Sequence, residues 1–318
     1  MSNEPTELAG KKGKWPLDDI VGQLRAARAE WRSHTGRLRE SGGRDLPSRH
    51  AMGHIIDSLI SALFPMRLGP ADLRAENEDF YVGYTLDSAL NMLLEQARLE
   101  LKYTARLDER RAGQDLDARA ERIVRDFAMI LPDLRYLLDT DVTAAYNGDP
   151  AARSMDEVLL CYPGILAIIY HRMAHRLYKS GLPLLARISS EIAHSVTGID
   201  IHPGAQIGHS FFIDHGTGVV IGETAIIGNY VRIYQAVTLG AKRFEVDESG
   251  NLQKGQARHP IVEDDVVIYA GATILGRIVI GKGSTIGGNV WLTRSVAPGT
   301  NVTQANAQNV PAHPERER

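Results

Sequence analysis

The sequence predicts an α+β protein in which a helical N-terminal domain is followed by a parallel β-helix. Three observations lead to this fold class. Apolar residues recur at helical spacing before Gly198, the period changes to six residues after it, and 16 of the 30 glycines but only three prolines lie between residues 201 and 300. Because a change of period coincides with a change of composition, we place a domain boundary near Gly198.

Six segments before this boundary combine an apolar stripe with a charged face and are predicted to be helices. They are residues 18–40, 48–65, 85–103, 116–139, 156–179 and 182–197. The first is followed by Ser41-Gly42-Gly43, a typical helix stop. The only cysteine, Cys161, falls in the fifth segment, where we expect it to be buried. A single cysteine cannot form an internal disulfide, so the chain needs no oxidising compartment.

The six-residue repeat forms two blocks of aliphatic residues. The first block has them at 201, 207 and 213, slips by two residues, and resumes at 221, 227, 233 and 239; the second has them at 262, 268, 274, 280, 286 and 292. Three hexads make one coil with three flat sides, and coils stacked about 4.8 Å apart bury the aliphatic column. Such a coil leaves no room for aromatic rings, which explains why the chain has only 20 aromatic residues.

These patterns divide the chain into four parts. We expect a disordered tail at 1–16, a helical domain at 17–197, the β-helix at 198–300 and a C-terminal tail at 301–318. Residues 241–258 are charged and lack the aliphatic column, so we expect them to leave the β-helix as an exposed loop. Such a loop can carry function or be a tolerated insertion, and periodicity does not decide between these alternatives.

Composition excludes several classes of protein. A net charge of −3 from 36 basic and 39 acidic residues argues against a nucleic-acid-binding surface. The polar start has no signal-peptide core. The most apolar stretch, residues 158–170, is shorter than the roughly 20 residues of a membrane span and contains a proline. We therefore expect a cytoplasmic protein that binds neither nucleic acid nor membrane.

The segment IDHGTGVVIGET, residues 213–224, contains more chemically active residues than a structural coil requires. A buried aliphatic column has no use for adjacent Asp214 and His215 followed by Gly216 and Gly218. An Asp-His pair with small neighbours suits a general base that a substrate approaches closely. The alternative is a polar corner that faces solvent.

Other candidate motifs are weaker. His171 and His175 lie four apart, as metal ligands on a helix can, but no acidic partner accompanies them, and a partly exposed helix face is the favoured interpretation. The residues His202, His209 and His215 could form a zinc site, but they do not share a stacking register, so we expect no metal. The segment GRIVIGKG, residues 276–283, has glycine where a phosphate-binding loop needs Ser or Thr, and the repeat already explains its glycines.

Four motifs together resemble serine O-acetyltransferase, a hexapeptide-repeat acyltransferase family. They are DIHPGAQIG from Asp200, IDHGTGVVIGETAIIG from Ile213, VTLG from Val237 and RHP from Arg258, and the resemblance covers about residues 149–298. It implies that the β-helix is left-handed. It also implies that the protein transfers acetyl from acetyl-CoA to the hydroxyl of L-serine, giving O-acetyl-L-serine and CoA, the first step of cysteine biosynthesis.

The resemblance assigns a role to each matching residue. His215 would be the general base and Asp200 would orient and support its imidazolium; a serine hydroxyl needs such a base because it is too weak an acid to ionise unaided. Arg258 and His259 would hold the serine carboxylate.

The remaining assignments concern the ammonium group and the co-substrate. Asp149 and Asp214 would bind the serine ammonium. Acetyl-CoA would lie between neighbouring subunits against Ala241, Ala270 and Gly288, whose small side chains allow close approach. Three further basic residues, Lys242, Arg243 and Lys282, could meet CoA phosphates or simply be solvated.

The resemblance also implies partners. We expect a homotrimer or a dimer of trimers, in which the helical domain serves oligomerisation and completes part of the serine site, and feedback inhibition by L-cysteine at that site. The chain ends VPAHPERER without a terminal isoleucine, so we expect no stable complex with O-acetylserine sulfhydrylase. Two rival functions are acyl transfer to a sugar or another acceptor and a non-catalytic scaffold; the Arg258-His259 pair favours a carboxylate-bearing acceptor.

Overall fold

The computed structural model describes residues 15–34, 46–107, 115–243, 252 and 255–305. The chain divides into two compact units, residues 1–45 and 46–318. The first unit contains helix α1 (Leu17–His34), none of whose residues is buried. The second unit contains the other described helices and all the described strands, and it holds every predicted site residue.

The described helices of the second unit cover most of the predicted helical region. They are α2 (Arg49–Leu63), α3 (Pro65–Leu68), the 3-10 helix η1 (Ala75–Asn77), α4 (Glu78–Leu107), α5 (Leu116–Met129), α6 (Leu131–Gly148), α7 (Met155–Cys161), α8 (Pro163–Lys179) and α9 (Pro183–Thr197). The predicted helices 116–139 and 156–179 are each two helices. The breaks precede Pro132 and Pro163, because proline cannot continue a helix but fits its first turn.

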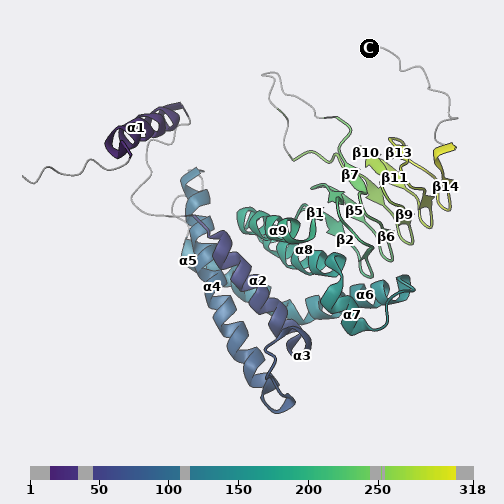
Figure 1. Ribbon diagram of the computed structural model, residues 1–318, viewed down its shortest axis with the longest axis horizontal. Helices are drawn as coiled ribbons and strands as arrows, with labels where there is room; N and C mark the ends of the chain where they lie inside the picture. Colours follow the sequence, from purple (N-terminus) through teal and green to yellow (C-terminus); the bar gives the residue numbers. More distant parts are fainter. Residues whose placement is uncertain (1–14, 35–45, 108–114, 244–251, 253–254, 306–318) are drawn as a thin grey trace, which may run out of the picture. The chain divides into compact units, whose positions relative to one another are not determined.

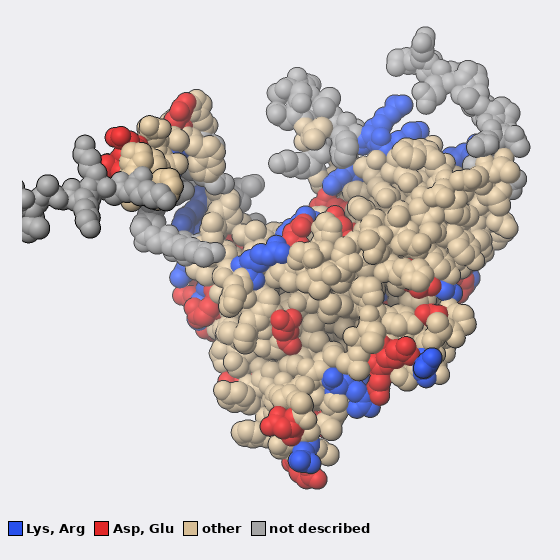
Figure 2. Space-filling model, viewed as in Figure 1, with Lys and Arg blue, Asp and Glu red and all other residues tan. Residues whose placement is uncertain are grey.

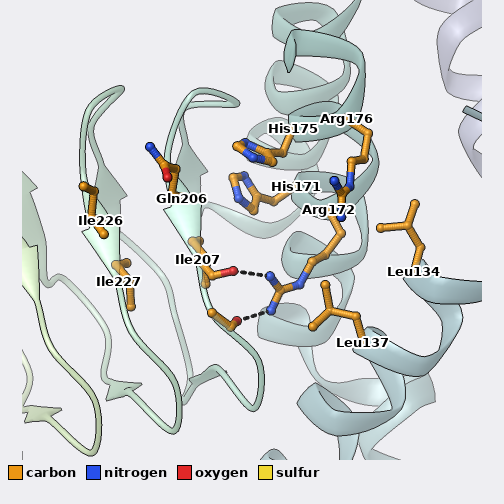
Figure 3. A pocket seen from close by; sticks show the side chains of 11 residues that line it. Leu134, Leu137, His171, Arg172, His175, Arg176, Gln206, Ile207, Ile226 and Ile227 are labelled. Carbon is orange, nitrogen blue, oxygen red and sulfur yellow. Dashed lines mark hydrogen bonds between the residues drawn. The ribbon is translucent and has the colours of Figure 1, made fainter. Parts of the chain in front are cut away.

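Two side-chain predictions in this region were wrong. Cys161 is exposed, because it is the last residue of the short helix α7, which buries only Val158. His171 is 3% exposed rather than partly exposed. It projects from α8 toward β2 (Figure 3), on the side of the helix that packs against the β-helix.

The strands form a left-handed parallel β-helix with three sheets, which confirms the predicted fold class. Sheet A contains β1 (Asp200–Ile201), β4 (Val220–Ile221), β7 (Thr238–Gly240), β10 (Thr273–Leu275) and β13 (Trp291–Leu292). Sheet B contains β2 (Gln206–Ile207), β5 (Ile226–Ile227), β8 (Ile261–Val262) and β11 (Val279–Ile280). Sheet C contains β3 (Phe212–Ile213), β6 (Arg232–Ile233), β9 (Val267–Ile268), β12 (Thr285–Ile286) and β14 (Asn301–Val302).

The register of these sheets follows the six-residue repeat. In sheet A, Ile201 pairs with Ile221, which pairs with Leu239, and the ladder continues to Ile274 and Leu292. All 13 aliphatic repeat positions belong to such inward columns, and all are buried except Ile207, which is half-buried at the edge of sheet B. The two blocks of the repeat therefore form one continuous stack, with residues 241–260 inserted between β7 and β8.

Helices close the N-terminal end of this stack. In Figure 1, α8 and α9 lie beside the first strands, and the later coils run away from them toward β14. Because helices cover the first coil where another coil would otherwise stack, an aromatic ring fits there: Phe211 is 1% exposed inside the coil. The expectation that the coils hold no aromatic rings was therefore wrong at this end.

A buried ion pair fixes the helices to the first coil. Arg172 of α8 donates to both carboxylate oxygens of Asp141 in α6, at 3.0 and 3.1 Å. It also donates to the carbonyls of Ile207 and Gly208 at 2.6 Å each, as the dashed lines of Figure 3 show. The backbone N–H of Phe211 donates to Asp141 at 2.9 Å. Because every polar atom of the pair is used, the charges are compensated despite their burial.

None of the helices in the described ranges is by itself long and apolar enough to cross a membrane. Only α7 and α8 taken together reach that length and composition, and they are bent by 74° at the break between them.

Candidate active site

The predicted site residues gather at two edges of the β-helix. We call the turns that lead from sheet C into sheet A the C/A corner, and the turns that lead from sheet A into sheet B the A/B corner. The C/A corner includes residues 214–219, 234–237, 269–272 and 287–290, and the described part of the A/B corner includes residues 202–205, 222–225, 241–243, 255–260 and 276–278. Asp214, His215, Ala270 and Gly288 lie at the first, whereas Ala241, Arg258 and His259 lie at the second.

His215 is pushed out of the coil by the two-residue slip in the repeat. The extra residues form a tight turn in which the N–H of Gly216 donates to the carbonyl of Asp214 at 2.7 Å. His215 has a φ of 59°, and its side chain is 70% exposed. Gly216, with a φ of 88°, allows this turn because a Cβ there would lie 2.4 Å from Ile199. The slip therefore presents one imidazole to solvent.

Asp214 is buried next to this imidazole. Its Oδ1 lies 3.7 Å from Nδ1 of His215, and its Oδ2 accepts a hydrogen bond from Nη2 of Arg232 at 2.9 Å. The guanidinium of Arg232 lies 5.0 Å from the ring centroid of Phe212 and 4.7 Å from that of Tyr234. The sequence did not single out Arg232, because it occupies an outward position of the hexad that the repeat leaves unrestricted.

The helical domain adds a second carboxylate to the C/A corner. Asp149 ends α6 and accepts hydrogen bonds from the hydroxyl of Tyr162 at 2.5 Å and from the N–H of Ala151 at 2.8 Å. These two bonds lower the pKa of Asp149, and its interactions with Arg232 and His215 lower it further. The hydrogen bond to Asp149, in turn, raises the pKa of Tyr162 to about 12. Asp149 is therefore an anion held beside Asp214 and His215.

A close approach holds this part of the helical domain in place. Gly164, in the first turn of α8, has no space for a side chain, because a Cβ would lie 2.2 Å from the carbonyl oxygen of Ile213. Ile213 directly precedes Asp214, so the contact sets the distance between the start of α8 and the turn at residues 214–216. Tyr162 immediately precedes α8 and was not predicted as a site residue; its one sequence signal is its position next to Pro163-Gly164.

At the A/B corner, Arg258 is held by the carboxylate of Glu223, which is itself held by Tyr178. Its Nη2 donates to Oε2 of Glu223 at 2.7 Å, and the hydroxyl of Tyr178 donates to Oε1 of the same residue at 2.9 Å. Burial raises the pKa of Glu223, but the hydrogen bonds from Arg258 and Tyr178 outweigh that effect and leave the pKa below its usual value. The Nη1 of Arg258 also donates to the carbonyl of Gln256 at 3.2 Å, so the guanidinium is fixed in one orientation.

His259 is a buried, neutral histidine. Its Nδ1 accepts a hydrogen bond from the N–H of Thr224 at 3.0 Å, so the ring hydrogen resides on Nε2. Burial, followed by the charge of Arg258, lowers its pKa to about 4. The ring lies directly over Gly222, where a Cβ would be 2.0 Å from it. His259 can therefore donate a hydrogen bond from a fixed position, but it stays uncharged near neutral pH.

Asp200 is not joined to His215 in the described part of the chain by any hydrogen bond or ion pair. It is the first residue of β1, pairs with Val220 in sheet A, and exerts its electrostatic effect on His202 at the A/B corner. The predicted pairing of Asp200 with His215 thus has no counterpart within a single chain.

The residues predicted for acetyl-CoA divide in the same way. At the C/A corner, a Cβ on Gly288 would lie 3.2 Å from the carbonyl of Ala270, so the two residues stack directly on each other. Ala241 follows β7 at the A/B corner, with Lys242 and Arg243 beside it. Lys282 lies instead in a turn from sheet B to sheet C, where its Nζ is 3.3 Å from Asp265.

The histidines considered for a metal do not converge. His202, His209 and His215 lie at three different corners of the first coil. Within the ranges that the structure describes, no three side chains of His, Cys, Asp or Glu lie close enough together to hold a metal ion.

Comparison with known proteins finds relatives in both sequence and structure. Residues 259–294 match the family model of the bacterial transferase hexapeptide (six repeats). A serine acetyltransferase of Synechococcus elongatus is 56% identical over 297 residues, which cover 93% of this chain and 92% of that protein. The crystal structure of serine acetyltransferase isoform 3 from Entamoeba histolytica, in complex with cysteine, has a TM-score of 0.67 and 36% identity, covering 83% of this chain and 84% of that one. The serine acetyltransferase of Neisseria gonorrhoeae, in complex with serine, has a TM-score of 0.52 and 29% identity, covering 83% and 96%.

Proposed function

The chain belongs to the serine acetyltransferase family, and from this membership we infer that it transfers the acetyl group of acetyl-CoA to the hydroxyl of L-serine. The products are O-acetyl-L-serine and CoA, and the reaction is the first step of cysteine biosynthesis. The observation that carries the assignment is the exposed His215 next to Asp214 at the C/A corner, within electrostatic reach of Asp149.

We propose His215 as the general base. Its imidazole takes the proton of the serine hydroxyl as the oxygen attacks the thioester carbonyl, forming the C–O bond. Collapse of the tetrahedral intermediate breaks the C–S bond, and the imidazolium returns the proton to the departing thiolate of CoA. One residue thus acts as base and then as acid, which requires access to both substrates, and the 70% exposure of its side chain provides that access.

The charged groups of the two corners match the charged ends of L-serine. Asp149 and Asp214 supply the negative charge for the ammonium group at the C/A corner. Arg258 and the Nε2–H of His259 supply donors for the carboxylate at the A/B corner. A sugar carries neither charge and an amino sugar carries only the ammonium, so the donors for a carboxylate favour an amino acid over the rival acceptors.

We propose that the complete site forms between two copies of the chain. Sheet A separates the two corners within one chain, whereas a cyclic trimer would place the C/A corner of one copy against the A/B corner of the next. Asp200 of one copy could then reach His215 of its neighbour. The outward side of sheet A includes exposed Val220 and Trp291, and the surface over the strands in Figure 2 is largely free of charged side chains. A dimer of trimers is compatible with the same contacts.

The same contact would form the acetyl-CoA site. Ala270 and Gly288 line one wall and Ala241 lines the other, so a pantetheine arm between the copies would meet small side chains on both sides. The nearby Lys242 and Arg243 are our candidates for the CoA phosphates.

We further propose that L-cysteine competes with L-serine for this site, because it differs only in carrying a thiol in place of the hydroxyl and a related enzyme binds it. The protein is proposed to act in the cytoplasm. The expectation that it forms no stable complex with O-acetylserine sulfhydrylase concerns residues 311–318, which lie outside the described residues.

Release of the CoA thiol tests the proposed function directly. The full-length protein is incubated with acetyl-CoA and either L-serine or glucosamine, and free thiol is measured. We expect turnover with L-serine and not with glucosamine, and inhibition by L-cysteine that excess L-serine reverses. Turnover with glucosamine alone would support the rival sugar acyltransferase, and no CoA binding in a thermal-shift assay would support a scaffold.

A further inference from the structure

Arg232 is the charged member of an otherwise uncharged column. It stands at the outward position of β6, between Phe212 of β3 and Val267 of β9 in the register of sheet C. The next positions along the column are Thr285 and Asn301. A lone arginine among these side chains is not required by the repeat, which uses only the inward column.

The surroundings of Arg232 hold its guanidinium in place. Phe212 and Tyr234 place ring centroids 5.0 and 4.7 Å from it, close enough for cation–π attraction. Phe212 is itself fixed by α6, because a Cβ on Gly148 would lie 2.9 Å from its ring. Gly148 is the last residue of α6, and the carbonyl end of a helix favours a nearby cation. Only 26% of the Arg232 side chain is exposed.

This fixed guanidinium determines which way Asp214 faces. It binds Oδ2 of Asp214 at 2.9 Å, which leaves Oδ1 on the side of His215, 3.7 Å from its Nδ1. Arg232 therefore presents one defined oxygen of Asp214 to the catalytic corner.

Arg232 also balances the charge of this corner. Asp149 and Asp214 together carry two negative charges, and its positive charge reduces the net value to one. A single ammonium group, such as that of an amino acid, then matches the corner. Without Arg232 the corner would carry two negative charges and would favour a dication. The charge of Arg232 also helps to lower the pKa of Asp149, after the larger effects of Tyr162 and Ala151.

We propose that Arg232 is a positioning residue for L-serine, acting through Asp214, and that it tunes the C/A corner for a substrate with one ammonium group. This inference rests on the proposed function. The alternative is that the Arg232–Asp214 ion pair has a purely structural role and no influence on substrate binding, as is common for surface ion pairs.

Steady-state kinetics of three variants separate these two roles. Arg232→Gln removes both the positive charge and the planar guanidinium, whereas Arg232→Lys keeps the charge but not the planar group. Arg135→Gln is a matched control, because Arg135 also pairs with a carboxylate, Asp139 at 3.0 Å, and also stacks on an aromatic ring, Phe64 at 4.3 Å, but in the helical domain.

We expect Arg232→Gln to raise KM for L-serine about tenfold or more, the effect of weakening one charge-assisted contact. Its kcat should fall less than KM rises, and KM for acetyl-CoA should stay unchanged. Arg232→Lys should recover part of the loss, and Arg135→Gln should leave both KM values at those of the wild type. Far-UV circular dichroism establishes that each variant is folded.

Wild-type turnover together with an unchanged KM for L-serine in folded Arg232→Gln would overturn this inference alone. Equal losses for Arg232→Gln and Arg135→Gln would overturn it as well, since they would reveal a general effect on stability. A wild-type protein without serine-dependent turnover would overturn the proposed function, and the inference with it.

Discussion

The two corners of the β-helix place a histidine in opposite environments, one exposed and one buried. At the C/A corner, His215 is 70% exposed, lies 3.7 Å from the carboxylate of Asp214 and interacts electrostatically with Asp149. At the A/B corner, His259 is buried against Gly222 beside the cation Arg258, and its pKa is lowered to about 4. An acidic, open environment suits a residue that must gain a proton, whereas a basic, closed one suits a donor that must stay neutral.

This difference shows that residue type alone does not define a catalytic base. Both histidines lie in short conspicuous motifs, DHGTG and RHP, and both lie near the same proposed substrate. The two histidines differ in their surroundings: His215 is exposed at one corner, whereas burial and then the charge of Arg258 keep His259 neutral at the other.

The largest effect is expected from His215→Ala. Because the variant loses the group that accepts the hydroxyl proton, kcat/KM for L-serine should fall by about 10²–10⁴-fold, the usual contribution of general-base catalysis. The thiol-release assay measures this loss. His194→Ala is the control, since His194 is also exposed but lies on α9, away from the C/A corner. Near-wild-type turnover in His215→Ala would show that the exposed histidine is not the base.

A subunit-mixing experiment tests whether the two corners work together across copies. His215→Ala and Arg258→Ala chains, each inactive alone, are co-expressed with different tags, and only trimers that contain both are purified. In a cyclic trimer of either mixed composition, one interface joins an intact His215 corner to an intact Arg258 corner, so we expect about a third of wild-type activity. Mixed trimers as inactive as the parents would place the whole site within one chain.

The sequence predicted the inward positions of the repeat but not the contacts between the repeat and the helices around it. The hexads predicted 13 inward residues because the period-six geometry acts on each position independently of distant chain segments. The buried ring of Phe211 was not predicted from the hexads, because its burial depends on helices that cover the first coil. Likewise, the break before Pro163 ended α7 at Cys161 and exposed it.

The same contrast applies to the candidate site. His215 and Asp214 could be picked out because they interrupt the repeat within one short motif. Tyr162, Glu223 and Arg232 could not, because each acquires its role from a partner between 13 and 35 residues away in the chain. Pairing Asp200 with His215 stays a prediction, because no hydrogen bond or ion pair joins the two residues in the described part of one chain.

A smaller effect is expected from Glu223→Gln at the A/B corner. The amide retains a hydrogen-bond acceptor for Arg258 but loses the charge, so the guanidinium should be less firmly oriented toward the serine carboxylate. We expect KM for L-serine to rise about three- to tenfold with kcat nearly unchanged, the loss of roughly 1 kcal/mol. Arg67→Gln, which breaks an exposed ion pair with Asp156 on the helical domain, should change neither constant. A fall in kcat without a change in KM would indicate that Glu223 acts on the chemical step instead.

The smallest effect concerns stability against pH and tests the closed corner alone. Because the pKa of His259 is about 4 in the folded protein and about 6.5 in an unfolded chain, the unfolded state takes up a proton between these values and the folded state does not. The contribution of His259 is therefore fully favourable above pH 6.5 and is lost as the pH falls toward 4. Urea unfolding at pH 7.0 and 4.5 should show that His259→Gln loses less stability over this interval than the wild type, by on the order of 1 kcal/mol. His215→Gln, altered at the open corner, should keep the wild-type pH dependence more closely; if His259→Gln keeps it equally well, then His259 is not the neutral, closed histidine that distinguishes the A/B corner.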